Sequence, residues 1–196
     1  RHLICSSLEE LWPNKDEKVL FLGDWCLIES RNFIWKNYDY KVVPYHWNDR
    51  SKFHDDLDKT FLIYEEMLLF LSKYLNDYHN LEKTTKYWRI ILGPWLIYII
   101  QIIYDRWEIV STLINNYEIS GYKSFEFDEK IVIPSCMDDF VKQCIGQNDE
   151  FIEDFWHEYI FSEVLKWRGI NPEIVQNTSY KNFNLPEDNV NNLLSK

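Results

Sequence analysis

The chain has 196 residues and a formal net charge of −11, with 46% hydrophobic and 17% aromatic residues. This length suits one domain with a sizeable core, and the acidic balance argues against a nucleic-acid-binding protein, which needs a basic surface. Four cysteines without paired spacing, and no visible secretory signal, are typical of a reduced protein, so we expect a cytoplasmic location.

The first 45 residues predict a strand–helix–strand unit. Residues 2–7 form a short β-prone run, and residues 19–22 are continuously apolar, as in strands of a parallel sheet that is covered on both faces. A helix is expected over 26–37, followed by a third strand over 41–43 that ends at Pro44. The pattern indicates a βαβ unit with a right-handed crossover.

Long helices are predicted next. Apolar residues recur at helical spacing over 57–78, with charged residues on the opposite face. The stretch 87–107 is rich in Ile and Trp and almost free of charge. Because Pro94 disfavours a straight helix, we expect a bend there and a buried central helix from Pro94 to about Asn116, rather than a membrane span.

Shorter elements complete the expected fold. Residues 122–127 read as an edge strand and 130–133 as another strand, while 137–145 and 149–167 read as helices, the second one stopped at Gly169. The fold class is therefore α/β, with a short, mostly parallel, Rossmann-like sheet under heavy helical cover in residues 1–176. The polar residues 177–196 are expected to form a tail or linker.

Several tryptophan-containing motifs occur in order: LEELWP at 8–13, FLGDWC at 21–26, PYHWNDR at 44–50, and YWRIILGPWL at 87–96 followed by DRW at 105–107. In these motifs the chain resembles a family of bacterial transferases associated with surface-polysaccharide gene clusters. The resemblance covers most of residues 2–110 and continues more weakly over 131–169.

The resemblance implies the N-terminal, acceptor-side half of a longer GT-B-like glycosyltransferase in polysaccharide biosynthesis, such as that of lipopolysaccharide and O-antigen. It implies a nucleotide-sugar donor and a saccharide acceptor as partners, a C-terminal domain beyond the linker, and no activity in this half alone. A non-catalytic interaction domain that docks a partner protein through exposed aromatic residues is the alternative. Peripheral membrane contact is compatible with either function.

Candidate catalytic groups follow the three expected strands. Glu9 and Glu10 come after the first strand, Asp24 after the second and His46 after the third. The carboxyl ends of parallel strands share one edge, where ligands bind. Sugar transfer with inversion needs a base for the acceptor hydroxyl, and a carboxylate or His suits this role. In GT-B-like enzymes the acceptor side generally supplies the base, so Asp24 and Glu9 rank first, although the similar family more often has Glu at the position of Asp24.

Alternatively, these acids have a structural role: Asp24 would cap the start of the following helix, and Glu9 and Glu10 would complement the positive end of a helix dipole. Substrate-binding candidates lie in the same motifs: Trp25, Trp47, Asp49, Arg50, Trp88 and Arg89. Arg50 suits a phosphate or carboxylate, or else locks its loop with Asp49. The Trp rings suit the apolar faces of sugars, or else belong to the core.

Neither a metal nor a cofactor is expected. His46, Asp49, His54 and Asp55 have no metal-ligand spacing, and the five glycines are scattered singly, so no glycine-rich phosphate loop is present in the sequence. A nucleotide-sugar donor would therefore bind mainly to the expected C-terminal domain.

Overall fold

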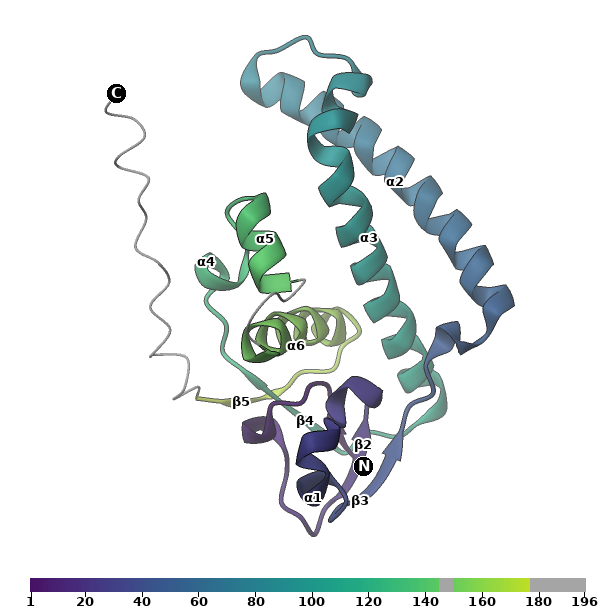
Figure 1. Ribbon diagram of the computed structural model, residues 1–196, viewed down its shortest axis with the longest axis vertical. Coiled ribbons are helices and arrows are strands. Elements are labelled where there is room, and N and C mark those ends of the chain that lie inside the picture. Colours follow the sequence, from purple (N-terminus) through teal and green to yellow (C-terminus); the bar gives the residue numbers. More distant parts are fainter. Residues whose placement is uncertain (145–149, 177–196) are drawn as a thin grey trace.

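In the computed structural model, which describes residues 1–144 and 150–176, helices surround a five-stranded parallel sheet (Figure 1). The strands lie in the order β3-β2-β1-β4-β5, and every neighbouring pair is parallel. Their bounds are His2–Ile4 for β1, Lys18–Phe21 for β2, Asp39–Val42 for β3, Gly121–Phe125 for β4 and Glu173–Val175 for β5. The predicted α/β class with a short, parallel, Rossmann-like sheet is confirmed.

The central strands are buried on both faces. Val19, Leu20 and Phe21 of β2 are completely inaccessible to solvent, which is the pattern expected where helices cover both sides of a parallel sheet. On one face Leu20 joins a core with residues of α3 and α6, including Ile109. On the other face Val19 and Phe21 pack with the rings of Trp12 and Trp35. Both faces of the sheet therefore contribute to the hydrophobic core.

Two long helices, α2 (Arg50–His79) and α3 (Thr85–Asn116), form a hairpin that extends away from the sheet (Figure 1). Asp49 caps the start of α2, because its side chain accepts hydrogen bonds from the backbone amides of Ser51 and Lys52. Asn80 ends α2 in the left-handed conformation, and Thr84 caps α3. The predicted amphipathic helix over 57–78 is confirmed and is longer at its N-terminal end.

The prediction that the central helix starts at Pro94 is wrong, because α3 begins at Thr85 and runs through Pro94. The proline removes the amide that would bond to the carbonyl of Ile90. Ile90 is 71% exposed, so water can reach this side of the helix. The cap at Thr84 then makes the earlier start favourable.

The expected burial of this helix is also wrong for its N-terminal half. Ile90, Ile91 and Tyr98 are 71%, 52% and 51% exposed. The C-terminal half is different, since Ile109 and Leu113 are fully buried against the sheet. The helix therefore packs into the main core where it covers the strands, whereas in its N-terminal half one face packs against α2, with Leu96 and Ile100 buried, and the other face is exposed.

Two further predictions need correction. The helix expected over 26–37 is instead two 3-10 turns, η2 (Asp24–Cys26) and η3 (Glu29–Arg31), followed by the short α1 (Asn32–Trp35). The indole of Trp35 donates to the carbonyl of Ile28 and folds the segment back on itself. Residues 130–133 do not form a strand, because the amides of Val132 and Ile133 make helical bonds four residues back in α4 (Glu129–Val132).

The C-terminal elements follow the sequence more closely. The helices α5 (Met137–Cys144) and α6 (Glu150–Trp167) are confirmed, and Gly169, at φ 81°, ends α6 as expected. The strand predicted over 122–127 is β4, which lies inside the sheet because the unpredicted β5 pairs beyond it. The tail expected over 177–196 lies outside the described residues.

Candidate functional site

The loops that follow β1, β2 and β3 meet at the carboxyl edge of the sheet. They contain the 3-10 turns η1 (Glu9–Leu11), η2 and η4 (His46–Asn48). Trp25 joins all three loops: its indole donates to the carbonyl of Cys5, with 2.8 Å between the heavy atoms, and its ring packs edge-on against Tyr45, 6.4 Å between centroids. The convergence expected from parallel strands is therefore present.

The strand order reverses between β1 and β4, and open α/β sheets bind ligands at such a switch point. Ser6 and Ser7, which follow β1, donate hydrogen bonds to Glu158 and Asp154 of α6; the Ser6 bond is 2.7 Å long. The guanidinium of Arg31 lies 3.2 Å from the Glu9 carboxylate and also bonds to Ser7. We call this group the switch-point cluster: Ser6, Ser7, Glu9, Arg31, Asp154 and Glu158.

Glu158 is completely buried within this cluster. It accepts hydrogen bonds from the hydroxyls of Tyr122 (2.5 Å) and Ser124 (3.1 Å) in addition to Ser6. Burial raises the pKa of Glu158 above its usual range, against the opposing effect of these hydroxyl donors. The only guanidinium of this cluster, that of Arg31, is already paired with Glu9, and the carboxylates of Glu9 and Asp154 can accept hydrogen bonds from hydroxyl groups.

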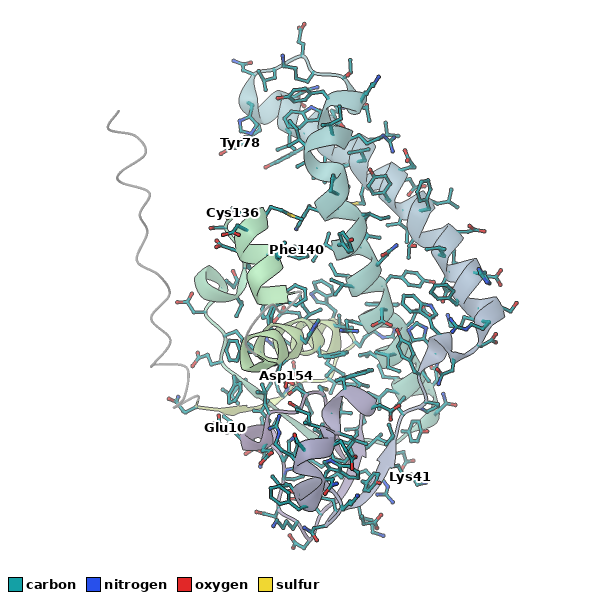
Figure 2. The ribbon with its side chains drawn as sticks, in the orientation of Figure 1. Glu10, Lys41, Tyr78, Cys136, Phe140 and Asp154 are labelled. Atoms are coloured by element: carbon teal, nitrogen blue, oxygen red, sulfur yellow. The ribbon has the colours of Figure 1, made fainter. Side chains whose placement is uncertain are left out.

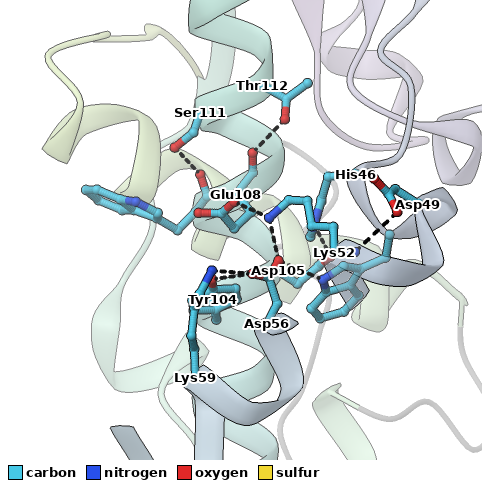
Figure 3. A network of polar contacts seen from close by, with 12 residues as sticks. His46, Asp49, Lys52, Asp56, Lys59, Tyr104, Asp105, Glu108, Ser111 and Thr112 are labelled. Carbon is cyan, nitrogen blue, oxygen red and sulfur yellow. Dashed lines mark hydrogen bonds and ion pairs between the residues drawn. The ribbon is translucent and has the colours of Figure 1, made fainter. Parts of the chain in front are cut away.

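A second group of polar side chains lies where the loop after β3 meets α2 and α3 (Figure 3). His46 Nε2 lies 3.0 Å from Asp105 Oδ1, and the hydroxyl of Tyr45 donates to the same oxygen over 2.8 Å. Because a carboxylate only accepts, Nε2 carries the hydrogen in this contact. Nδ1 is buried and has no hydrogen-bond partner among the described residues.

Asp105 is held in its charged form. Burial by itself would raise its pKa, but the bonds from His46 and Tyr45 and the adjacent Arg106 lower it below the usual value. Arg106 also contacts Nδ1 of His157 over 3.2 Å. Since a guanidinium only donates, His157 accepts with Nδ1 and is neutral.

Asp56 forms the other half of this group and is completely buried. Burial would raise its pKa, but its hydrogen bonds outweigh that effect and lower it. Its four donors are Lys52, Lys59, Tyr104 and the indole of Trp47. Lys52 also bonds to Glu108 over 2.7 Å, and although burial opposes the change, the two carboxylates raise the pKa of Lys52 to about 12. We call this second group the interhelix cluster: His46, Lys52, Asp56, Tyr104, Asp105, Arg106, Glu108 and His157.

Potential metal ligands also occur in the interhelix cluster. One ligand atom from each of His46, Asp56 and Glu108 lies within 4.8 Å of the other two. One imidazole and two carboxylates suit a divalent ion such as zinc. However, the ammonium of Lys52 bonds to both carboxylates. The lysine thus supplies the positive charge that a metal would bring to this position.

The four candidate catalytic residues lie in different environments in the structure. Asp24 opens η2 directly after β2, and its exposed carboxylate has no hydrogen bond or ion pair within the described part of the chain. Glu9 is paired with Arg31. Glu10 is exposed beside it and lies on the same side of the molecule as Asp154 (Figure 2). His46 is almost completely buried.

Two of the tryptophans expected to bind substrate lie at this edge. Trp25 stacks on Phe161 of α6, with 5.7 Å between centroids and 6° between ring planes, and Arg106 lies over its ring. Trp47 donates to Asp56. Arg50 lies 6.0 Å from the centroid of Phe53 and lines a pocket with Trp47. Both tryptophans therefore have structural contacts in addition to any contact with a ligand.

Three other candidates have structural partners. Asp49 is the cap of α2. Trp88 lies in the distal part of the hairpin, where its indole donates to Asn76, and the neighbouring Arg89 forms a bidentate pair with Glu65 at 2.5 and 2.6 Å. The structure does not bring Trp88 and Arg89 to the carboxyl edge of the sheet (Figure 1).

Several residues of the two clusters were not predicted as site residues. Asp154 and Glu158 lie four positions apart in a helix rich in aromatic residues, and this spacing places two carboxylates on one helical face. That signal is visible in the sequence. The contacts of Asp56 with Tyr104 and of His46 with Asp105 have no local signal, because they join segments that are far apart in the chain.

Comparison with known proteins identifies a family. The sequence model of the LIC12162 family transferases matches residues 1–194, which include both polar clusters. No curated protein and no solved structure shows significant similarity to the chain. Because the match extends over nearly all of the sequence, the chain belongs to the LIC12162 family of transferases.

Proposed function

We propose that this chain is the acceptor-side domain of a GT-B-like glycosyltransferase, which transfers a sugar from a nucleotide-sugar donor to a surface-polysaccharide acceptor. A transferase requires a donor and an acceptor, and the family supplies that general class. The observation that supports the proposal most directly is the meeting of the loops after β1, β2 and β3 around Trp25, with the exposed carboxylate of Asp24 at the same edge.

The chemistry of the switch-point cluster favours an acceptor rich in hydroxyl groups. The carboxylates of Glu9 and Asp154 can accept hydrogen bonds from sugar hydroxyls. A phosphate at this position would compete with Glu9 for the guanidinium of Arg31 and would lie near the carboxylate of Asp154. We therefore assign the acceptor to this domain and the nucleotide part of the donor to a second, C-terminal domain.

Asp24 is the base in this proposal. A general base must reach the proton that it removes and must be free to accept it. Asp24 is open to an acceptor because it is exposed, and it has no partner among the described residues that would hold its carboxylate. The charge of Glu9 is neutralised by its ion pair with Arg31, and the unbonded nitrogen of His46, Nδ1, is buried. Both residues are therefore weaker candidates for the base than Asp24. The alternative of a non-catalytic interaction domain is disfavoured by the transferase family.

The proposal is tested by Asp24→Asn in the intact protein. The amide keeps the size of the side chain but cannot accept the proton, so turnover should fall about 10²- to 10⁴-fold. The assay measures release of nucleoside diphosphate from a panel of nucleotide sugars in the presence of a polysaccharide acceptor fraction. Circular dichroism and the thermal unfolding midpoint report whether the variant is folded.

The matched control is Asp16→Asn, an exposed aspartate that precedes β2 and so lies at the opposite edge of the sheet. It should leave turnover unchanged. Unchanged turnover in a folded Asp24→Asn variant would remove Asp24 from the mechanism, and Glu9→Gln would then be the next variant to examine.

A further inference from the structure

An apolar groove runs between α3 on one side and α4, α5 and α6 on the other. Its volume is about 530 Å³, within the range of small-molecule sites. Six of its lining residues show its character: Ile91, Trp95, Ile99, Met137, Phe140 and Trp156. Figure 2 shows Phe140 between α5 and α3. Its lining is mainly apolar, with Ser135 and Tyr159 among the few polar side chains, so the groove suits a hydrocarbon chain better than a sugar or a nucleotide.

The groove is open to solvent on both of its walls. Ile91 on α3 is 52% exposed, and Ile133 and Met137 on the opposite wall are 52% and 44% exposed. The exposed apolar surface continues along the hairpin through Ile90 and Tyr98. Soluble proteins seldom leave a contiguous surface of this kind without a partner.

The composition of α3 indicates what kind of partner this is. By length and hydropathy alone the helix could cross a membrane, and only 17% of its most apolar 18-residue window is buried. A core helix of the same composition would be mostly buried. On the neighbouring α2, Phe70, Tyr74 and Tyr78 form an exposed ladder of stacked rings that reaches the distal end of the hairpin. Aromatic side chains of this kind are favoured at the boundary between lipid and water.

The distal part of the hairpin, residues 67–104, differs in net charge from the rest of the chain. Residues 67–104 contain four cationic side chains, Lys73, Lys83, Lys86 and Arg89, and two anionic ones, Asp77 and Glu82. This segment carries +2, or +1 when Glu65, the ion-pair partner of Arg89, is included, whereas the whole chain carries −11. A basic distal end suits anionic lipid headgroups, and the acidic body would be kept away from them.

We propose that the groove binds a hydrocarbon chain of a membrane lipid while the distal hairpin rests on an anionic bilayer surface. The lipid would enter past Ile91 and Met137, whose side chains line both walls of the open groove. This inference does not depend on the proposed sugar transfer, because it rests on the hairpin and the groove and not on the carboxyl edge of the sheet.

The first test is sedimentation of the 196-residue chain with phosphatidylglycerol vesicles. The chain should co-sediment, and Ile91→Lys and Met137→Lys should each weaken binding at least tenfold, because they place a charge in the groove. Both positions are about half exposed, so the variants should fold, which circular dichroism checks. The matched control is Phe33→Lys: Phe33 is 68% exposed on α1, away from the hairpin, and this variant should bind like the wild type.

The second test locates the lipid chain through tryptophan fluorescence. Vesicles with brominated acyl chains should quench the protein, and Trp95→Phe should remove more of this quenching than Trp107→Phe, since Trp95 lines the groove and Trp107 does not. Equal quenching loss in the two variants, or no sedimentation of the wild type, would overturn the proposal. A protein dimer that Ile91→Lys dissociates, without vesicle binding, would assign the surface to a second copy instead.

Discussion

His46 Nε2 and Asp105 Oδ1 lie 3.0 Å apart, although the two residues are 59 positions apart in the sequence. This contact joins the loop after β3 to the middle of α3. Tyr45 bonds to the same carboxylate oxygen, and its ring packs against Trp25. The position of the third loop at the carboxyl edge therefore depends on a helix that also builds the projecting hairpin.

Replacing Asp105 should strongly destabilise the fold. Asp105→Ala leaves His46 without its acceptor and Arg106 without its neighbouring charge, in a site where Asp105 is 4% exposed. Removing one partner of a buried charged network typically costs about 3–5 kcal/mol. Urea denaturation measures the free energy of unfolding. The control, Asp55→Ala on the exposed face of α2, should change it by less than about 0.5 kcal/mol, and an equally small change at Asp105 would contradict the role of this network.

The long-range character of this contact explains which features the sequence could predict. Strands β1 and β2 and the helices α2, α5 and α6 follow from local patterns, namely continuous apolar runs and helical periodicity. The parallel order then brings the loops after β1, β2 and β3 to one edge, as expected. Predictions from local pattern fail where tertiary contacts decide, as in the segment that Trp35 folds back onto Ile28.

In the candidate site, too, the sequence predicts what depends on local pattern and misses what depends on tertiary contacts. Asp24 could be placed after β2 from the sequence alone, because only the strand and its direction matter. Asp56 and Glu158 could not be recognised, since their burial depends on donors from distant segments. Asp49 was a candidate ligand contact, but its position before α2 makes it a cap. Sequence alone cannot decide whether a polar residue at a helix start faces a ligand or its own backbone.

His157 should make the protein less stable in mild acid. Burial first, and then the charge of Arg106, lowers the pKa of His157 to about 3. Because the folded-state pKa lies below the unfolded value of about 6.5, the stabilisation is complete above that pH and is lost as the pH falls toward 3. One such group contributes at most about 1.4 kcal/mol per pH unit.

His157→Asn tests this dependence, because the amide oxygen can still accept from Arg106 but does not titrate. The free energy of unfolding, measured in urea between pH 7 and pH 4, should decrease less steeply in this variant than in the wild type. The matched control is His79→Asn, which removes an exposed imidazole at the end of α2 without touching this network. Identical slopes in wild type and His157→Asn would show that His157 does not bind protons differently in the two states.

Glu158 should produce the opposite dependence on pH. Burial raises its pKa above the unfolded value of about 4.3. The folded state therefore favours the neutral acid, and stability is lost as the pH rises from that value through the raised pKa. Glu158→Gln does not titrate, so its stability relative to wild type should improve between pH 4 and pH 7. Glu126→Gln, on the exposed residue after β4, should show no such trend; a relative stability of Glu158→Gln that stays constant with pH would contradict the prediction.

Gly23 is needed because the indole of Trp25 lies against it. A Cβ atom at this position would lie 2.1–2.5 Å from three carbons of the Trp25 ring, so Gly23→Ala must displace the ring. Overpacking of this kind typically costs about 1–3 kcal/mol. The displacement would also disturb the bond from Trp25 to Cys5, which joins the first two loops.

A double-mutant cycle in urea separates this clash from other effects of the alanine. Because Trp25→Leu removes the large ring, Gly23→Ala should cost less free energy of unfolding in the Trp25→Leu background than in the wild type. An equal cost in both backgrounds would mean that the ring is not the obstacle. A smaller cost in the Trp25→Leu background would show that Gly23 and Trp25 of the FLGDWC motif are energetically coupled. The absence of a side chain at Gly23 then leaves room for the Trp25 ring, which joins the loops at the carboxyl edge of the sheet.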